Sequence, residues 1–243
     1  MIGVSIEEKS YEGSQQSAIS NLNLIVNPGE FVAILGPSGS GKTTLLQLVS
    51  GLDRQFSGKI KLNAVDGRVP QVGYLFQDAR LMPWLTVLDN VRLVTGGCSR
   101  EPAKRVLQDV GLGDSLNSYP SQLSGGMQRR VALARALLHD PDVLLMDEPF
   151  VSLDGPNADR LRHLVLEWWQ KKNSAVLFVT HSLDEAIVMA DRLVFFSPGP
   201  ASVILDIPVA IERPRAMGVQ AVKVFKQQLL TRYPNLLEGR VLE

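Results

Sequence analysis

The stretch FVAILGPSGSGKTTLLQLVS, residues 31–50, decides the fold. It begins with five apolar residues, continues through a glycine-rich loop and ends in a segment with a helical pattern. Residues Gly36 to Thr43 match G-x-x-x-x-G-K-[ST] at every defined position, and the apolar run before them fits a strand buried on both faces. A buried strand that leads through such a loop into a helix predicts an α/β domain with a phosphate-binding loop.

The composition of this loop suits a nucleotide. Glycines let the backbone wrap closely, so that N–H groups point at phosphate oxygens, and the helix that follows adds the partial positive charge of its N-terminus. We expect Lys42 to neutralise the β- and γ-phosphates and the Thr43 hydroxyl to take one Mg²⁺ position; the alternative is a glycine turn with a surface lysine. The residues predicted to contact ATP here are Gly36, Pro37, Ser38, Gly39, Ser40, Gly41, Lys42, Thr43 and Thr44.

Three further apolar runs, at 72–76, 143–146 and 175–180, also read as core strands. Helical patterns between the strands lie at 42–50, 101–110, 126–139, 158–171 and 183–190. Ligands of open parallel sheets bind at the carboxyl ends of the strands. The polar or small residues that follow the four strands, and that we expect at one site, are Gly36, Gln77, Asp147, Glu148 and His181.

Each of these residues has a functional and a plainer interpretation. We expect Asp147 to be a second holder of Mg²⁺ and Glu148 to polarise an attacking water, although a lone Asp-Glu pair before a proline is usually an exposed turn. His181 is expected to contact the γ-phosphate, although a single histidine at a strand end is more often structural.

The remaining segments predict how the domain is divided. Alternating polar and apolar residues at 3–11, 19–30 and 58–65 fit an antiparallel sheet beside the mainly parallel core. We expect a nucleotide-binding core at about 1–76 and 141–205, with an inserted, mostly helical subdomain at about 77–140. The tail at about 206–243 is expected to contain a docking helix at 219–233 without chemistry. The predicted fold is therefore a single α/β domain with an antiparallel β-subdomain and an α-helical subdomain.

A second glycine-rich stretch, LSGGMQRR at 123–130, raises the question of a second phosphate-binding surface. Ser124 can cap a helix that runs from Gly126 to Leu138, and the glycines expose N–H groups at its positive end. The stretch belongs to the inserted subdomain, so we expect it to serve the ATP of a second copy arranged head to tail. On its own, this pattern usually marks only a turn.

Together these motifs resemble the ATP-binding subunit of an ABC transporter over essentially the whole chain. The resemblance implies that Gln77 senses the γ-phosphate and contributes to the metal site, and that Glu148, His181, Gln77 and Lys42 take part in ATP hydrolysis. It also implies that Asp154 touches the opposite monomer and that Tyr11 stacks on adenine. The signature residues implied to act on the partner's ATP are Leu123, Ser124, Gly125, Gly126, Met127 and Gln128. The cofactors implied are ATP and Mg²⁺, the latter held by Thr43, Gln77 and Asp147.

The resemblance also implies partners. A permease subunit is expected to dock near Gln77–Val91, where Leu81–Leu85 form an apolar patch. Leu85 and Val87 are equally compatible with a core position, whereas Trp84 is more typical of an interface. The sequence around this patch and the "ERPR" tail are similar to importers of nitrate, sulfonates and taurine. The implied assembly is a homodimer or pseudo-dimer at the cytoplasmic face of the inner membrane, joined by permeases and indirectly by a solute-binding protein.

Composition limits the alternatives. Lys+Arg 25 against Asp+Glu 25 gives no net charge, which argues against a nucleic-acid partner. Cys98 is the single cysteine, so no internal disulfide is expected, and neither a secretory signal nor a membrane-spanning run is evident. An ABC exporter subunit, an ABC ATPase outside transport and an unrelated phosphate-loop kinase are the alternatives. The segment between the phosphate loop and the signature has no sustained heptads, which disfavours the chromosome-type ATPases that carry a coiled coil there. A phosphate-loop kinase does not require a signature that acts on a second subunit.

Overall fold

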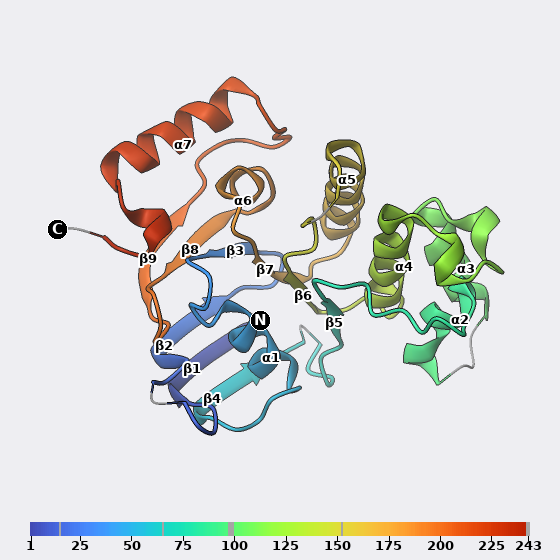
Figure 1. Ribbon diagram of the computed structural model, residues 1–243, viewed down its shortest axis with the longest axis horizontal. Helices are drawn as coiled ribbons and strands as arrows, with labels where there is room; N and C mark the ends of the chain where they lie inside the picture. The colour runs from blue at the N-terminus through green and yellow to red at the C-terminus, as the bar shows by residue number, and fades with distance from the viewer. Residues whose placement is uncertain (15, 65, 97–99, 152, 242–243) are drawn as a thin grey trace. The chain divides into compact units, whose positions relative to one another are not determined.

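The computed structural model describes residues 1–14, 16–64, 66–96, 100–151 and 153–241. Cys98 therefore lies outside the described residues. The chain forms two units, the first made of Met1–Pro70 with Ser174–Glu243 and the second of Gln71–Asn173. Each unit has its own strands and helices (Figure 1). Among the described residues, no helix has the length and apolarity needed to span a bilayer.

Unit 1 contains a three-stranded antiparallel sheet with the order β2-β1-β4. Its strands are β1 (Ile2–Lys9), β2 (Ile19–Val26) and β4 (Ser57–Leu62). Burial alternates along β1 and β2, because one face of the sheet packs inward while the other meets solvent. The predicted antiparallel subdomain is confirmed, with strands that end earlier than the sequence pattern.

The second sheet of unit 1 is mainly parallel. The central strand β3 (Phe31–Leu35) pairs in parallel with β7 (Ala175–Val179) and β8 (Arg192–Phe196), and β9 (Val203–Pro208) pairs antiparallel with β8. Every residue of β3 and β7 is buried, as expected of strands covered on both faces. The helices of this unit are α1 (Lys42–Ser50), α6 (Leu183–Met189) and α7 (Gln220–Arg232), with a 3₁₀ turn at Leu236–Glu238.

Unit 2 combines a parallel strand pair with helices. The strands are β5 (Val72–Leu75) and β6 (Val143–Asp147), paired from Val72↔Val143 to Leu75↔Met146. Its helices are α2 (Val87–Arg92), α3 (Arg100–Asp109), α4 (Gly125–Leu137) and α5 (Gly155–Lys171), and short 3₁₀ turns lie at Leu93–Thr95, Gly113–Ser115 and Pro120–Gln122.

One helix boundary differs clearly from the sequence pattern. The pattern placed the start of α5 at Ala158, whereas the helix begins at Gly155. The Asp154 side chain caps it by accepting a hydrogen bond from the Asn157 N–H at 3.0 Å, and Pro156 in the first turn lacks an N–H that would need a partner. The apolar periodicity starts later than the helix because the first turn carries capping residues.

Candidate functional site

The glycine-rich loop of unit 1 connects the end of β3 to the start of α1. Gly39 and Gly41 have φ angles of 76° and 81°, in the left-handed region that favours glycine. A Cβ atom on Gly41 would lie 2.8 Å from the Ala18 carbonyl oxygen, so the space is also closed to larger residues. The two glycines therefore fix the path by which the loop enters the helix.

Lys42 is held within this loop. Its side-chain ammonium donates to the carbonyl oxygens of Gly36 and Pro37, at 2.9 and 2.7 Å, and to the Ser40 hydroxyl at 3.3 Å. Only 7% of Lys42 is exposed, so the alternative of a surface lysine is wrong. The three bonds hold the ammonium at the loop, and a phosphate oxygen that binds Lys42 replaces one of these acceptors.

The N-terminus of α1 is suited to an anion. Its N-cap, Gly41, has no side chain that could occupy the first N–H groups of the helix. By contrast, the N-cap residue Ser124 of α4 accepts a bond from the Met127 N–H at 3.3 Å. The first turn of α1 therefore combines aligned backbone donors with the fixed charge of Lys42.

Tyr11 lies beside the start of α1. Its hydroxyl is 3.0 Å from the Thr44 hydroxyl, and 44% of the residue is exposed. The ammonium of Lys9 lies 4.5 Å from the centre of the Tyr11 ring and forms a 2.7 Å ion pair with Asp53. The hydrogen bond from Lys9 lowers the pKa of Asp53. The structure thus brings Tyr11 to the phosphate loop, and Lys9 is a contact that the sequence pattern did not reveal.

His181 follows the carboxyl end of β7, next to the end of β3. Val179 pairs with Ile34, and the Thr180 N–H donates to the Ile34 carbonyl oxygen at 3.2 Å. Gly36 lies two residues beyond Ile34, so the phosphate loop and His181 leave adjacent strands at the same edge. His181 is exposed there.

In unit 2, Gln77 follows β5, and Asp147 is the last residue of the paired strand β6. Because Leu75 pairs with Met146, both residues leave the same edge of this pair. Asp147 is 5% exposed, and burial together with the charge of Asp147 raises the pKa of Tyr74. The carboxylate and amide oxygens at this edge are hard donors of the kind that Mg²⁺ prefers.

Glu148 adopts a backbone conformation that is uncommon for a residue with a side chain. Its φ angle is 43°, in the left-handed region. Such a conformation costs on the order of 1–3 kcal/mol and is found preferentially at functional sites. Asn21, Arg80 and Asp140 share this region, with φ angles of 46–51°, so the conformation alone does not separate Glu148 from a residue of an acidic turn.

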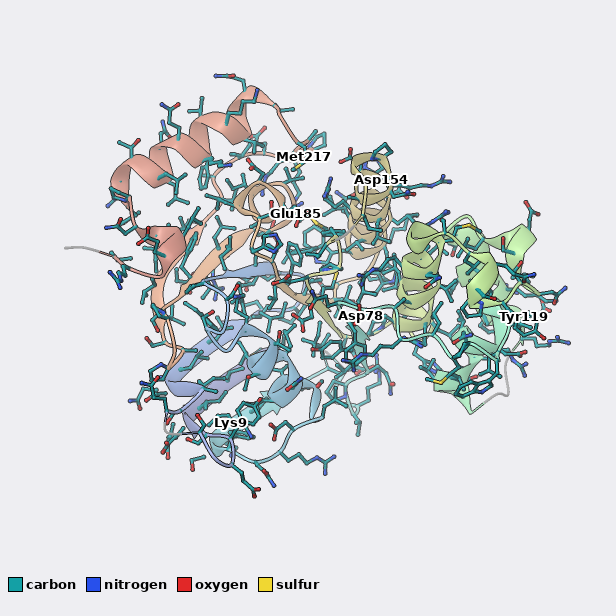
Figure 2. All side chains as sticks on the ribbon, in the orientation of Figure 1. Lys9, Asp78, Tyr119, Asp154, Glu185 and Met217 are labelled. Carbon is teal, nitrogen blue, oxygen red and sulfur yellow. The ribbon has the colours of Figure 1, made fainter. Side chains whose placement is uncertain are left out.

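The signature stretch forms the start of α4. The Ser124 hydroxyl caps the helix, and the Gln128 side chain donates to the Pro120 carbonyl oxygen at 3.0 Å. A Cβ on Gly126 would lie 2.8 Å from the Asn157 side chain of α5, whereas a Cβ on Gly125 would meet nothing within 4 Å. Asp154, labelled in Figure 2, caps the same α5 helix. The two glycines therefore differ: Gly126 is required by packing, and Gly125 leaves an open surface.

Two arginines of α4 bind the backbone that follows β5. Arg129 donates to the Phe76 carbonyl oxygen at 3.1 Å, and Arg135 donates to those of Ala79 and Arg80 at 2.8 and 2.9 Å. Burial lowers the pKa of both guanidinium groups. The signature helix thus holds the segment that contains Gln77, although the sequence pattern assigned neither arginine a role.

The segment after Gln77 presents Trp84 to solvent. Trp84 is 71% exposed, while Val87 is fully buried and belongs to the core. Asn90 is fully buried, accepts from the Met82 N–H at 2.7 Å and donates to the carbonyl oxygens of Met82 and Leu85 at 3.1 Å. The buried amide therefore shapes the turn that carries the exposed indole.

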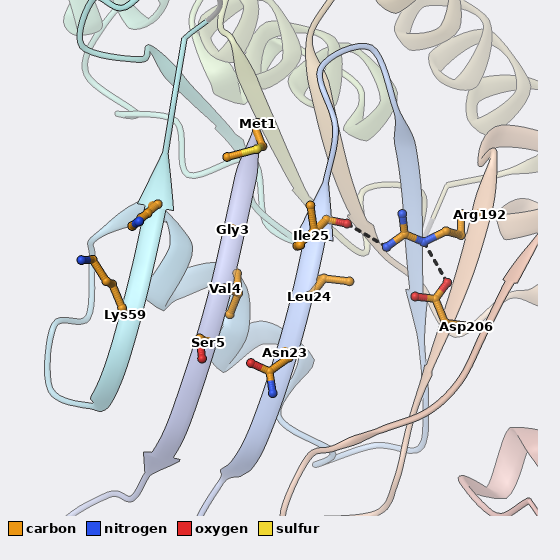
Figure 3. A pocket seen from close by; sticks show the side chains of 11 residues that line it. Met1, Gly3, Val4, Ser5, Asn23, Leu24, Ile25, Lys59, Arg192 and Asp206 are labelled. Atoms are coloured by element: carbon orange, nitrogen blue, oxygen red, sulfur yellow. Dashed lines mark hydrogen bonds and ion pairs between the residues drawn. The ribbon is translucent and has the colours of Figure 1, made fainter.

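A cavity of 610 Å³ lies on the antiparallel sheet of unit 1 (Figure 3). Lys59, Lys61 and Ile25 line it, together with Arg192, which donates to the Ile25 carbonyl oxygen and pairs with Asp206, both at 2.8 Å. No phosphate-loop residue lines this cavity, so it is not the nucleotide site.

Tyr11, the phosphate loop and His181 belong to unit 1. Gln77, the signature, Asp147, Glu148 and Asp154 belong to unit 2.

Comparison with known proteins agrees with these motifs. Residues 19–151 match the family model described as ABC transporter. An uncharacterized ABC transporter ATP-binding protein of Methanocaldococcus jannaschii is 40% identical, over 96% of this chain and 89% of the relative. An aliphatic sulfonates import ATP-binding protein of Bacillus subtilis is 35% identical, over 96% of this chain and 94% of the relative.

A solved dimeric ATP-binding cassette, in a post-hydrolysis state bound to ADP and Pi, has a similar fold. It gives a TM-score of 0.76 at 30% identity and covers 87% of this chain and 100% of that one. The family match spans more than half of the chain and includes both glycine-rich motifs. The chain therefore belongs to the ABC transporter family, as one of its ATP-binding subunits that hydrolyse ATP.

Proposed function

We propose that this chain powers the uptake of a small solute, of the sulfonate, nitrate or taurine type, through separate membrane subunits. The main structural support for ATP binding is the position of Lys42. Its ammonium is held by the glycine-rich loop directly at the N-terminus of α1. The relatives named as importers of aliphatic sulfonates support the solute class and the direction of transport.

The roles of the nucleotide-binding residues follow from their chemistry. Residues Gly36–Thr44 hold the phosphates through backbone N–H groups and Lys42, and the partly exposed ring of Tyr11 offers a stacking surface for adenine. No cluster of three or more His, Cys, Asp or Glu side chains suited to a metal occurs among the described residues. A Mg²⁺ ion bound through ATP phosphates and a few oxygen ligands fits this donor set. Thr43, Gln77 and Asp147 would supply those ligands.

Bound Mg²⁺ would supply charge neutralisation between the β- and γ-phosphates. Glu148 orients and deprotonates the attacking water, and Gln77 and His181 contact the γ-phosphate. Lys42 stabilises charge that develops on the transferred phosphoryl group. Phosphoryl transfer needs mainly positioning and electrostatics, which these four side chains provide.

The signature acts on the ATP of a second subunit. Residues Leu123–Gln128 place the open surface of Gly125 and the positive end of α4 at the partner's γ-phosphate, and Asp154 contacts the opposite monomer. The dimeric state of the related cassette supports this arrangement. A homodimer, or a dimer with a near-identical chain, thus contains two composite sites.

The permease docks on the segment Gln77–Val91, whose exposed Trp84 is presented by the buried Asn90. A solute-binding protein acts on the permease from the other side, and the ATPase lies at the cytoplasmic face of the membrane. We keep the functional division into a nucleotide core at about 1–76 and 141–205, a helical signature subdomain at about 77–140 and a tail at about 206–243.

A complementation experiment tests the composite site. Lys42→Ala removes the phosphate-loop cation, whereas Ser124→Arg blocks the signature, so each variant alone should hydrolyse ATP very slowly. In a mixture, a mixed dimer regains one intact site from the phosphate loop of one chain and the signature of the other. Random pairing should restore up to about a quarter of wild-type turnover, since half of the dimers are mixed and each has one intact site of two.

The control is each variant measured alone at the same total concentration. A mixture that stays as inactive as its components would exclude the shared site, and a fully active Ser124→Arg variant would show that the signature is not required. Binding of ATP to the Ser124→Arg chain should be preserved, because its own phosphate loop is unchanged.

A further inference from the structure

Two arginines of the segment that follows β9 close the carboxyl end of α6. Arg215 donates to the carbonyl oxygens of Ile187 and Ala190, at 2.9 and 2.5 Å, and Arg213 donates to that of Met189 at 2.5 Å. The last carbonyl groups of a helix have no partner within the helix. The two guanidinium groups therefore satisfy three acceptors at a helix end that is almost completely buried.

These arginines are themselves anchored in unit 1. Arg215 also donates to the Ile211 carbonyl oxygen at 2.8 Å, and Arg213 pairs with Asp191 at 2.8 Å. The other carboxylate oxygen of Asp191 accepts from the N–H of Phe31, the first residue of β3, at 3.1 Å. Through these bonds the tail ties the end of α6 to the central strand of the sheet.

The opposite end of α6 is held as well. Lys226 of α7 forms a 2.5 Å ion pair with Asp184, in the first turn of α6. Glu185, labelled on α6 in Figure 2, accepts from the Thr180 hydroxyl at 2.8 Å, and its N–H donates to the Ser182 hydroxyl at 3.3 Å. The tail thus contacts α6 at both ends.

His181 is the residue directly before the N-cap of α6. Its neighbours are joined by a 3.0 Å hydrogen bond from the Ser182 N–H to the Thr180 hydroxyl, while His181 itself is exposed. α6 has only seven residues, and helices of about this length are not stable without tertiary contacts. Whatever fixes α6 therefore also fixes the backbone of His181.

We propose that the carboxyl-terminal segment positions His181: Arg213, Arg215 and Lys226 are positioning residues that hold α6 and thereby place His181 for ATP hydrolysis. This inference rests on the proposed role of His181. It replaces the expectation that the tail has no part in the chemistry. A misplacement of about 1 Å can lower a rate on the order of 100-fold, so partial loosening should lower kcat about tenfold.

The kinetic test compares two lysines of the same helix in the full-length chain. Lys226→Ala removes the ion pair to α6, whereas Lys223→Ala changes an exposed lysine and is the matched control. Arg215→Lys keeps a positive charge but loses the planar fork that reaches several carbonyl groups. We expect Lys226→Ala and Arg215→Lys to lower kcat while KM for ATP changes less than about twofold. In a His181→Ala background, neither change should lower the residual rate further, because the group that they position is missing.

A spectroscopic test does not depend on activity. The chain has three histidines, so the imidazole NMR signal of His181 can be assigned by its loss in His181→Ala. We expect this signal to shift in Lys226→Ala and Arg215→Lys and to stay in place in Lys223→Ala. An unmoved signal, or equal fold losses of kcat with and without His181, would overturn the inference. A wild-type chain without ATPase activity would instead refute the proposed function, and the NMR result would still decide whether the tail positions His181. If Arg215→Lys fails to fold, the surface variant Lys226→Ala gives the answer.

Discussion

The two neighbouring glycines of the signature offer a sharp test of the packing in unit 2. Gly125→Ala and Gly126→Ala add the same methyl group at adjacent positions in the first turn of α4. The new Cβ meets nothing within 4 Å at Gly125, but at Gly126 it lies 2.8 Å from the Asn157 side chain. Neither glycine has a positive φ angle, so backbone strain does not separate the two variants.

Two opposing effects set the size of the change. Alanine favours a helix over glycine by about 1 kcal/mol, an upper limit in the first turn. An extra methyl group in a closely packed contact destabilises by about 1–3 kcal/mol. We therefore expect Gly125→Ala to be neutral or to stabilise by up to about 1 kcal/mol. Gly126→Ala should be about 1–3 kcal/mol less stable than Gly125→Ala, because only it carries the clash.

Urea unfolding followed by tryptophan fluorescence measures this difference, since Trp84, Trp168 and Trp169 all lie in unit 2. Combining Gly126→Ala with Asn157→Ala should recover part of the lost stability, because it removes the two atoms at 2.8 Å and leaves only the Asn157 Cβ at 3.2 Å. Gly125→Ala should lose ATPase activity because its methyl group crowds the proposed surface for the partner's ATP, whereas Gly126→Ala should lose it because the clash with Asn157 displaces the first turn of α4. If Gly126→Ala is as stable as Gly125→Ala, the packing argument is wrong.

Glu148→Gln should retain ATP binding but lower turnover by about 10²–10⁴-fold, as expected for loss of a general base; unchanged phosphate release would show that another group acts as the base. Trp84→Ala should leave the ATPase rate of the isolated chain within about twofold while reducing co-purification with the permease, since aromatic anchors dominate such contacts; undiminished co-purification would contradict the docking proposal. Because the hydrogen bond from Lys9 lowers the pKa of Asp53, the ion pair stabilises the fold above the unfolded-state pKa of about 4 and is lost as pH falls through the lower, folded-state pKa. Urea unfolding between pH 7 and 2 should therefore show a shallower acid loss in Asp53→Asn than in the wild type.

Most of the core could be predicted from the sequence because its strands are continuous apolar runs. FVAIL and AVLFV are buried at every position. A short apolar run of this kind fits a strand that is covered on both faces. The strand Arg192–Phe196 carries the same signal and was nevertheless not identified. The strand Val203–Pro208 is harder to recognise, because only partial burial and its pairing with Arg192–Phe196 define it.

The motif residues could be predicted because they act at fixed spacings within short segments. The contacts of Asn157, Arg135 and Arg215 could not be predicted. Asn157 packs against Gly126, and the two arginines bind backbone carbonyl oxygens that are distant in the sequence. A carbonyl oxygen leaves no trace in residue identity, so only the folded arrangement reveals these contacts. The left-handed conformation of Glu148 is equally invisible in the sequence.

The hydrogen bonds from Arg129 and Arg135 to the segment after β5 have a consequence for how the side chains of this segment can vary among related transporters. Both guanidinium groups bind main-chain oxygens, which every amino acid offers, so residues such as Ala79 can be replaced without releasing the attachment. In the proposed docking, the side chains of that segment can therefore change to suit another permease without altering these two attachments. Grafting the outward-facing side chains of a related transporter onto this loop is therefore a rational route to chimaeric pumps.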